Sequence, residues 1–392
     1  MAMGAWRSAL VDRVEHAAIE ADRSWRRWAR RSVSGDGIHL HEGRDHGRAV
    51  DRLAATLARS GGTSARPGGY GRVGLDGVLG DLDRLAVPVD VPATAAEGGF
   101  RWDDEDFVDQ EWWPQGITTS ADASDTDDIL GRRVVVVGWY AKRVKGATQG
   151  ARLTFVDVTD PSAPRYRHVL LVEPVRPWWK VWSRRAAMHP VAVHAGGIVW
   201  YGPSILVADT RGGVRTFVLD DICRVPGGWR GYEYVIPQRT SYRAVNDRGF
   251  VPFKFSFVSL DRSGDEHQLI AGEYGRTGTR TRLVRFRIDA ARAALALEGR
   301  AARPVELLED QLPHMQGATV VGGTYYISTS AGKKPGSLWV RPPGGELQQY
   351  EGVLSIGPED LTYVPQQDCF WNCSEYPGKR YVYRIPRPHL DP

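Results

Sequence analysis

Two short segments, Gln115-Gly116-Ile117-Thr118-Thr119 and Gln316-Gly317-Ala318-Thr319-Val320, begin with the same Gln-Gly pair and continue as short apolar or β-branched runs. Three more segments align with them by their distance from the strand-like runs that follow: Gly196-Gly197-Ile198-Val199-Trp200, Phe255-Ser256-Phe257-Val258-Ser259 and Glu359-Asp360-Leu361-Thr362-Tyr363. A pattern that recurs along a chain indicates an internal repeat. The region from about residue 100 to 392 is therefore interpreted as five copies of one β unit.

Each opening segment precedes further short runs rich in β-branched and aromatic residues, with Gly, Pro and Asp turns between them, as is typical of antiparallel strands. The second runs are 134–140, 205–209, 269–274, 325–328 and 370–376, and the third runs are 153–158, 214–219, 283–288, 337–341 and 381–385. Four units add a fourth run, near 168–174, 232–237, 305–308 and 350–354. Sheets repeated without an intervening helix predict an all-β fold, a five-bladed β-propeller, with an open all-β sandwich as the alternative.

The fifth unit ends soon after its third run and has no fourth. A propeller closes when a strand from one terminus completes the sheet begun by the other, which removes an exposed sheet edge. The N-terminal side must therefore supply the closing strand, and we expect it from Leu85–Val91 or from the Phe100–Phe107 region.

By this architecture, residues 100–392 resemble β-propeller proteins in general. The resemblance rests on the repeats, because the chain has no WD dipeptide ending each unit, no kelch signature and no series of calcium loops. Five-bladed glycosidases typically place catalytic carboxylates in separate blades, whereas the corresponding positions here are Gln115, Gly196, Phe255, Gln316 and Glu359. The resemblance thus implies the fold and little of the function.

The remaining chain is predicted to hold a helical N-terminal extension over 1–62 and a Gly-rich, acidic linker over 63–99. One helix has an apolar face from Val11 to Trp28, and a second contains Val50, Leu53 and Leu57. Residues 73–130 carry 15 acidic and 2 basic side chains, so we expect much of this segment to lie outside the core.

The overall composition, 42% hydrophobic and 25% charged, is that of a globular protein, and three cysteines cannot form a disulfide framework. No apolar run is long enough to span a bilayer, and the N-terminus lacks the apolar core of a signal peptide, so a cytoplasmic location is expected. The content of Arg, Ala and Gly suggests a GC-rich, actinobacterial-like genome, in which such propellers often serve specialised metabolism.

Polar residues at the start of the opening strands should converge at one mouth of the central channel, where closed β folds usually bind ligands. His194 and His314 are predicted to face each other and act as acid and base, with Glu359 orienting one of them. The alternative is that these residues only hydrogen-bond strand ends and channel water. The predicted substrate-binding residues are Trp113, Gln115, Lys254, Gln316, Asp360, Trp178, Lys333 and Lys379.

A divalent metal is a further option at the same mouth. His194, His314 and Glu359 would suit zinc, whereas Glu359, Asp360 and Gln115 would suit calcium. The loops after the second strands each carry cations, and a ring of such charges would attract an anion. Nucleic acid is a less favoured partner, because the acidic 73–130 segment would repel phosphates.

Two functions follow from these predictions. The first is an enzyme that acts on a small anionic organic substrate by acid–base chemistry, as a lyase, cyclase or hydrolase. The second is a non-catalytic propeller that binds a protein or a glycan. Loss of turnover with retained affinity after replacement of both histidines would favour the first.

Overall fold

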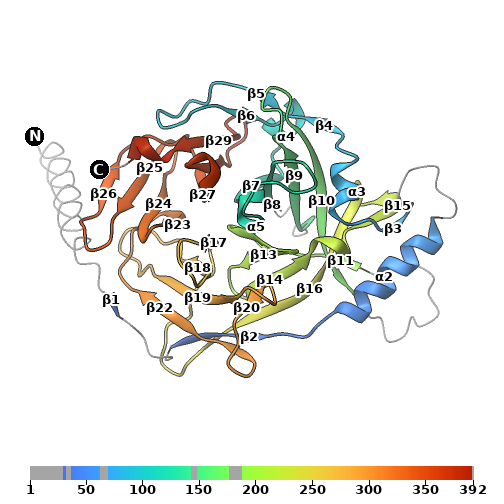
Figure 1. Ribbon diagram of the computed structural model, residues 1–392, viewed down its shortest axis with the longest axis horizontal. Helices are drawn as coiled ribbons and strands as arrows, with labels where there is room; N and C mark the ends of the chain where they lie inside the picture. Colours follow the sequence, from blue (N-terminus) through green and yellow to red (C-terminus); the bar gives the residue numbers. More distant parts are fainter. Residues whose placement is uncertain (1–29, 32–36, 62–68, 143–147, 176–187, 391–392) are drawn as a thin grey trace, which may run out of the picture.

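The computed structural model describes residues 30–31, 37–61, 69–142, 148–175 and 188–390. Antiparallel ladders of strands stand around a common axis, and the first strand of each ladder lies nearest that axis (Figure 1). Each first strand contacts the next around the ring, in the order β7, β12, β17, β23, β27 and back to β7. The prediction of an all-β propeller is confirmed.

The strands fall into five ladders. The first contains β7 (Trp112–Thr119), β8 (Val134–Ala141), β9 (Ala151–Asp157) and β10 (Arg165–Pro174), and the second contains β12 (Ile198–Tyr201), β13 (Ser204–Asp209), β14 (Gly213–Val218) and β16 (Tyr232–Asn246). The third contains β17 (Phe257–Asp261), β18 (Gln268–Gly272), β19 (Leu283–Asp289) and β22 (Pro304–Leu308), and the fourth contains β23 (Met315–Val321), β24 (Thr324–Ala331), β25 (Lys334–Arg341) and β26 (Gln348–Tyr350). The fifth contains β27 (Pro358–Val364), β28 (Cys369–Ser374) and β29 (Tyr381–Pro386), followed by β6 (Gly99–Arg101) and β5 (Val87–Pro88).

The N-terminal side supplies the closing strands, as predicted. β6 pairs with β29 in the register Tyr381 to Arg101, and β5 pairs with β6 through Val87 and the same Arg101. Both expected segments therefore contribute, since β5 lies within Leu85–Val91 and β6 overlaps the start of Phe100–Phe107. The fifth sheet is completed by a segment distant in sequence, and the edge of β29 is covered.

Apolar side chains fill the space between neighbouring ladders. Val135 of the first ladder packs in one cluster with Trp371 of the fifth, and Phe155 packs with Val207 of the second. Three more clusters join the second ladder to the third, the third to the fourth, and the fourth to the fifth. The core is thus a closed series of layers between sheets, so each ladder is held by both of its neighbours.

Glycines allow the first strands to approach one another near the axis. A Cβ atom on Gly116 would lie 2.8 Å from the Cα of Gly197, and one on Gly197 would lie 2.2 Å from the backbone nitrogen of Val258. A side chain at either position would force the strands apart. The glycines of the opening segments are therefore explained by close packing around the axis.

The N-terminal segment packs on the outside of the ring. The predicted second helix is α2 (Gly47–Ser60), and its Val50, Leu53 and Leu57 are buried. Before it, β2 (Ile38–Glu42) extends the second ladder along β16, a strand that the sequence interpretation missed because four charged or histidine side chains surround Ile38 and Leu40. The predicted helix from Val11 to Trp28 lies outside the described residues.

Shorter elements complete the described chain. They are β1 (Arg30–Arg31), β3 (Gly71–Arg72), α3 (Gly74–Leu79), β4 (Arg84–Leu85), α4 (Asp104–Val108), α5 (Ser120–Ala123), β11 (Met188–Pro190), β15 (Cys223–Trp229), β20 (Ala294–Leu295) and β21 (Ala301–Ala302), with 3-10 turns η1 (Leu219–Asp221), η2 (Pro365–Gln367) and η3 (Arg387–Leu390).

The acidic 73–130 segment lies outside the core only in part: many of its residues are exposed or half-buried, as expected, but others are buried. It contains the fully buried strand β7, and the side chain of Asp106 is also buried. Asp106 bonds to Arg152 at 2.7 Å, to His168 at 2.8 Å and to Arg84 at 3.3 Å. Arg152, from another part of the chain, pairs with the buried carboxylate, and charge counting along the sequence cannot reveal this contact.

Candidate functional site

The ends of the first and second strands enclose a cavity of about 930 Å³ at the axis. It is lined by Gln115, His194, Gly196, Thr210, Lys254, Ser256, Tyr274, His314, Gln316, Ser330, Ala331, Gly332, Glu359, Glu375 and Tyr376. Six of the predicted site residues are among them: Gln115, His194, Lys254, His314, Gln316 and Glu359. These six come from all five ladders, because each lies just before or in the first half of a first strand and these parts of the strands converge around the axis.

Glu359 and Glu375 provide the acidic groups of the cavity. The side chain of Glu359 is almost fully buried, and its backbone oxygen accepts hydrogen bonds from Ser328 at 2.8 Å and Asn372 at 2.9 Å. Burial raises the pKa of Glu359 well above its ordinary value, and the carboxyl groups of Glu375 and Asp360 raise it further. This environment favours the protonated form of the Glu359 carboxyl group.

Glu375 has a different environment. Burial raises its pKa as well, but hydrogen bonds from Gln115 and Tyr376 and the charges of Lys142 and Arg380 oppose that change. The Gln115 Nε2 atom donates to Glu375 Oε2 at 3.0 Å. The two carboxyl groups are therefore held in unequal environments at one cavity, and Glu375 is the more readily ionised.

The two histidines occupy equivalent places before the first strands of the second and fourth ladders. The His194 ring is accessible to solvent inside the cavity, and its centroid lies 4.2 Å from that of Tyr140. His314 Nδ1 lies 3.2 Å from the Tyr274 hydroxyl. Enclosure by the cavity walls lowers the pKa of both imidazoles, and Arg276 lowers that of His314 further, so both rings are neutral near pH 7.

Backbone strain accompanies these histidines. Ala195, which follows His194, has φ +52°, and His314 itself has φ +58°. Left-handed backbone at residues other than glycine is uncommon and is concentrated at functional sites. Hydrogen bonds hold the second of these positions, because the His314 N–H donates to the Gly275 oxygen at 2.7 Å and its own oxygen accepts from Ser330 at 3.1 Å.

Asp360, predicted to bind substrate, is placed elsewhere. It is fully buried, and its carboxylate accepts hydrogen bonds from the backbone N–H groups of Ile117, Ile198 and Leu361 and from the Ser259 hydroxyl. These donors belong to four different first strands. Asp360 thus ties the strands together around the axis, and it points away from the cavity because adjacent strand residues face opposite sides.

The other predicted substrate-binding residues do not line the cavity either. Trp113 lies behind its wall, where its indole N–H donates to the Gln110 oxygen at 3.0 Å and the Lys142 Nζ atom lies 3.0 Å from the ring centroid. Lys333 and Lys379 are exposed on turns, and Trp178 lies outside the described residues. The cations predicted to ring the mouth are not among the described lining residues, and one of them, Arg380, is fully buried.

Neither metal set predicted from the sequence is assembled. Within the described residues, no three His, Cys, Asp or Glu side chains form a group that could hold a metal ion. His194, His314 and Glu359 share the cavity without forming such a group, and Asp360 bonds to the first strands outside the cavity.

Sequence reasoning missed Glu375, Tyr376 and Tyr274 as lining residues. All three belong to the Glu-Tyr endings shared by the third and fifth units, Glu273-Tyr274 and Glu375-Tyr376. Both endings directly follow a second strand, at the same edge of the ring as the starts of the first strands. That repeated ending was the signal that could have identified them.

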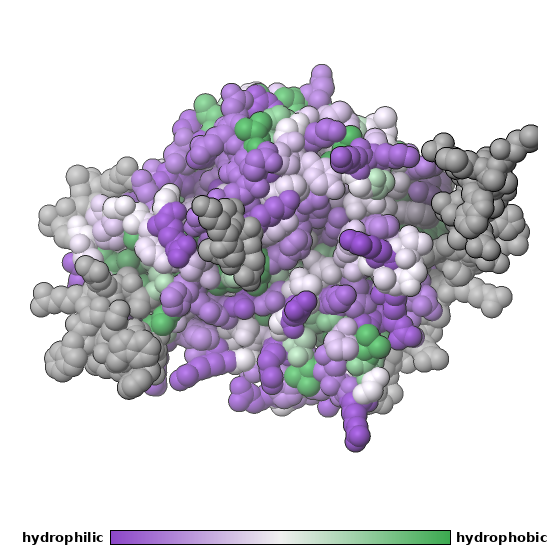
Figure 2. Space-filling model, turned by 180° about the vertical axis from the view of Figure 1, so that it is seen from behind, coloured by the Kyte–Doolittle hydropathy of each residue, from purple (hydrophilic) through white to green (hydrophobic). Residues whose placement is uncertain are grey.

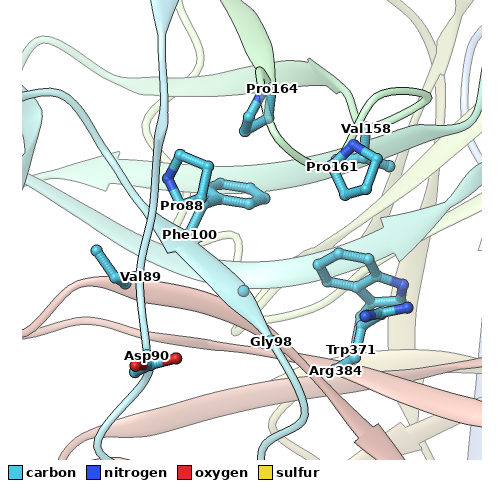
Figure 3. Close-up of a pocket in the computed structure, with 11 residues that line it drawn as sticks. Pro88, Val89, Asp90, Gly98, Phe100, Val158, Pro161, Pro164, Trp371 and Arg384 are labelled. Atoms are coloured by element: carbon cyan, nitrogen blue, oxygen red, sulfur yellow. The ribbon is translucent and has the colours of Figure 1, made fainter.

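A second cavity, of about 410 Å³, lies where the closing strands meet the first and fifth ladders. Pro88, Phe100, Pro161 and Trp371 lie around it, with Arg384 beside Trp371 and Asp90 on the opposite side (Figure 3). Its lining is largely apolar and holds no pair of acid–base groups comparable to Glu359 and Glu375. We therefore assign the candidate site to the axial cavity.

The surface seen from behind is predominantly hydrophilic, with hydrophobic residues in small separate groups outside the grey atoms (Figure 2). Scattered exposed apolar residues are normal for soluble domains and do not indicate a docking surface. Among the described helices, none has the length and apolar character needed to cross a membrane. The cytoplasmic location stays a prediction.

No family model matches the sequence, and no similar protein was found among the curated ones. Among solved structures, the Cps50 (Swd1) β-propeller domain of Myceliophteria thermophila aligns with a TM-score of 0.29 and 15% identity, over 63% of this chain and 67% of that one. Drosophila Plexin A, solved in complex with Semaphorin 1b, aligns with a TM-score of 0.24 and 10% identity, over 78% of this chain and 88% of that one. Similarities this low give no information on function.

Proposed function

We propose that the five ladders are the blades of a five-bladed propeller whose axial cavity is the active site of an enzyme. The reaction is acid–base chemistry on a small organic molecule, of the lyase, cyclase or hydrolase type. The observation that carries this proposal is the pair Glu359 and Glu375, two carboxyl groups at one cavity with unequal environments. Pairs of titratable groups with separated pKa values are typical of acid–base sites.

In this proposal Glu359 is the general acid, because its burial keeps the carboxyl group protonated. Glu375 is the general base, because four neighbouring groups favour its ionised form. Gln115 bonds to the Glu375 carboxylate at 3.0 Å and fixes its direction. Two groups that titrate at one site give a bell-shaped dependence of rate on pH.

The two histidines, predicted from the sequence as acid and base, are now proposed to hold the substrate. Their pKa values are lowered, so near pH 7 each ring is neutral and offers one donor and one acceptor. The Tyr274 hydroxyl, 3.2 Å from His314 Nδ1, limits the orientation of that ring. Binding and proton transfer are thus assigned to different residues of the cavity.

The test compares turnover by wild-type protein, Glu359→Gln and Glu375→Gln. Each protein is incubated with the small-molecule fraction of a cell extract, and consumed compounds are identified by mass spectrometry. The matched control is Glu351→Gln, which changes an exposed glutamate on a turn after β26. Loss of a general acid or base is expected to lower the rate about 10²–10⁴-fold, while the control leaves it unchanged.

Equal consumption by Glu359→Gln and wild type would contradict the assignment of the acid. A compound that binds wild-type protein but is never consumed would instead favour the alternative, a non-catalytic propeller that binds a protein or a glycan. Circular dichroism of each variant establishes that lost turnover does not reflect unfolding.

A further inference from the structure

We infer that the ligand of the axial cavity is a small, neutral, polyhydroxylated molecule, such as a sugar or a cyclitol, held by hydrogen bonds around its whole outline. This inference rests on the proposed function and specifies the substrate class of the same cavity. It replaces the anionic substrate expected from the sequence.

The lining is built mostly from polar and aromatic side chains. Among the described lining residues the largest aliphatic side chain is that of Ala331, and the others include the hydroxyl and amide groups of Thr210, Ser256, Ser330, Gln115 and Gln316. Ligand pockets are ordinarily lined mainly by apolar side chains, with only a few polar groups. An apolar ligand here would leave many polar groups without partners, and each such group costs binding free energy.

Two tyrosine rings supply the flat surfaces that such a ligand needs. Tyr274 remains 38% exposed although its hydroxyl faces His314, and Tyr376 lines the cavity beside Glu375. A tyrosine presents an apolar ring and one polar tip. A sugar ring is complementary to this combination, because its C–H faces can stack on the rings while its hydroxyl groups reach the polar side chains.

The charges in the cavity are balanced. Lys254 is the one lysine or arginine among the described lining residues, and the carboxyl groups of Glu359 and Glu375 line the same cavity. An anion would meet these carboxyl groups, and a cation would meet Lys254. The loop cations that suggested an anionic substrate are not among the lining residues that the structure describes. A neutral ligand therefore loses the least binding free energy on entering the cavity.

Binding is measured with myo-inositol, glucose and maltose as neutral probes, glucuronate and glucose 6-phosphate as anions, glucosamine as a cation, and p-cresol as an apolar molecule. Titration calorimetry and saturation-transfer NMR on the full chain report affinity without requiring turnover. We expect a neutral probe to bind best. Gln316→Leu, which removes hydrogen-bonding groups and retains size, should weaken that binding about tenfold.

Two controls sharpen this test. Gln366→Leu changes an exposed glutamine just beyond the other end of β27 and should leave affinity unchanged. Lys254→Met should weaken the binding of a neutral probe no more than Gln316→Leu does, whereas it would abolish the binding of an anion that depends on this lysine.

The inference is overturned if the anions, the cation or p-cresol bind more tightly than every neutral probe, or if no probe binds. Turnover that still depends on Glu359 would then leave the proposed function standing with another substrate. Conversely, a neutral probe that binds through Gln316 while no compound is ever consumed supports the ligand class and contradicts the enzyme.

Discussion

The third and fifth ladders contain the same pair of side chains in two different states. In each ladder a glutamate directly follows the second strand and an arginine directly precedes the third: Glu273 with Arg282, and Glu375 with Arg380. In the third ladder the pair is closed, with Arg282 Nε at 2.7 Å and Nη2 at 2.8 Å from the Glu273 carboxylate. Both side chains are buried, and the carboxylate also accepts a hydrogen bond from the Lys254 backbone N–H at 2.9 Å.

In the fifth ladder the arginine bonds to backbone oxygens instead of the glutamate carboxyl group. Arg380 Nη1 donates to the Asp106 backbone oxygen at 2.6 Å, and its Nε donates to the backbone oxygen, not the carboxylate, of Glu375 at 2.8 Å. Nη2 has no partner among the described residues, and burial lowers the pKa of Arg380 to about 10. The Glu375 carboxyl group therefore faces the cavity. One repeated pair serves stability in one ladder and, in our proposal, chemistry in the other.

The largest expected effect is on stability. Arg282→Met leaves the buried Glu273 carboxylate without its partner, and it should lower the free energy of unfolding by about 3–5 kcal/mol. Arg380→Met breaks hydrogen bonds to two backbone oxygens and should cost only about 1–3 kcal/mol. Urea unfolding followed by tryptophan fluorescence measures both. Equal losses would show that the two arginines have the same role.

Part of the candidate site could be predicted from the sequence. Repeats alone placed His194, His314 and Glu359 at one cavity, because the starts of first strands converge in any closed ring. The state of Glu375 depends on the Asp106 backbone oxygen, which lies 274 residues away from Arg380 in the chain. No local pattern contains that contact. Lys333 and Lys379, which were predicted to bind substrate, do not line the cavity for a simpler reason, because both are exposed to solvent.

The side of the strand that Asp360 faces could not be predicted from the sequence. Asp360 is the direct neighbour of Glu359, and a change of one position along a strand moves a side chain to the opposite side. β27 also has an irregular register against β28 between Pro358 and Leu361. Which of the two acidic residues faces the cavity was therefore decided by the local geometry of the strand.

An intermediate effect on stability should distinguish the two glutamates of the cavity from Glu273 of the closed pair. Glu375→Gln and Glu359→Gln remove carboxyl groups whose pKa values are raised in the folded protein, so each should increase the free energy of unfolding at pH 7 by about 0.5–2 kcal/mol. Glu273→Gln should decrease it, because Arg282 loses its buried partner. Thermal or urea unfolding of the three variants provides the measurement.

The pH dependence of that gain follows from linkage. A carboxyl group with a raised folded-state pKa binds more protons when folded, so its unfavourable contribution begins near the unfolded pKa of about 4.3 and grows as the pH rises. The stability advantage of Glu359→Gln should accordingly be small at pH 4 and larger at pH 7. An advantage that is constant over this range would contradict the raised pKa.

The smallest expected effects come from the two tyrosines of the repeated ending. Tyr376 hydrogen-bonds to the Glu375 carboxyl group and favours its ionised form, so Tyr376→Phe should raise the pKa of Glu375 and move the acidic limb of the pH–rate profile to higher pH. Tyr274 hydrogen-bonds to His314 instead, so Tyr274→Phe should weaken substrate binding by about fivefold or less and leave that limb in place. Stability should change little in either variant, since each loses one partly exposed hydroxyl group. A pH–rate profile that shifts equally in both would mean that the third and fifth ladders contribute alike to the titration of the site, and that Glu375 is not the base.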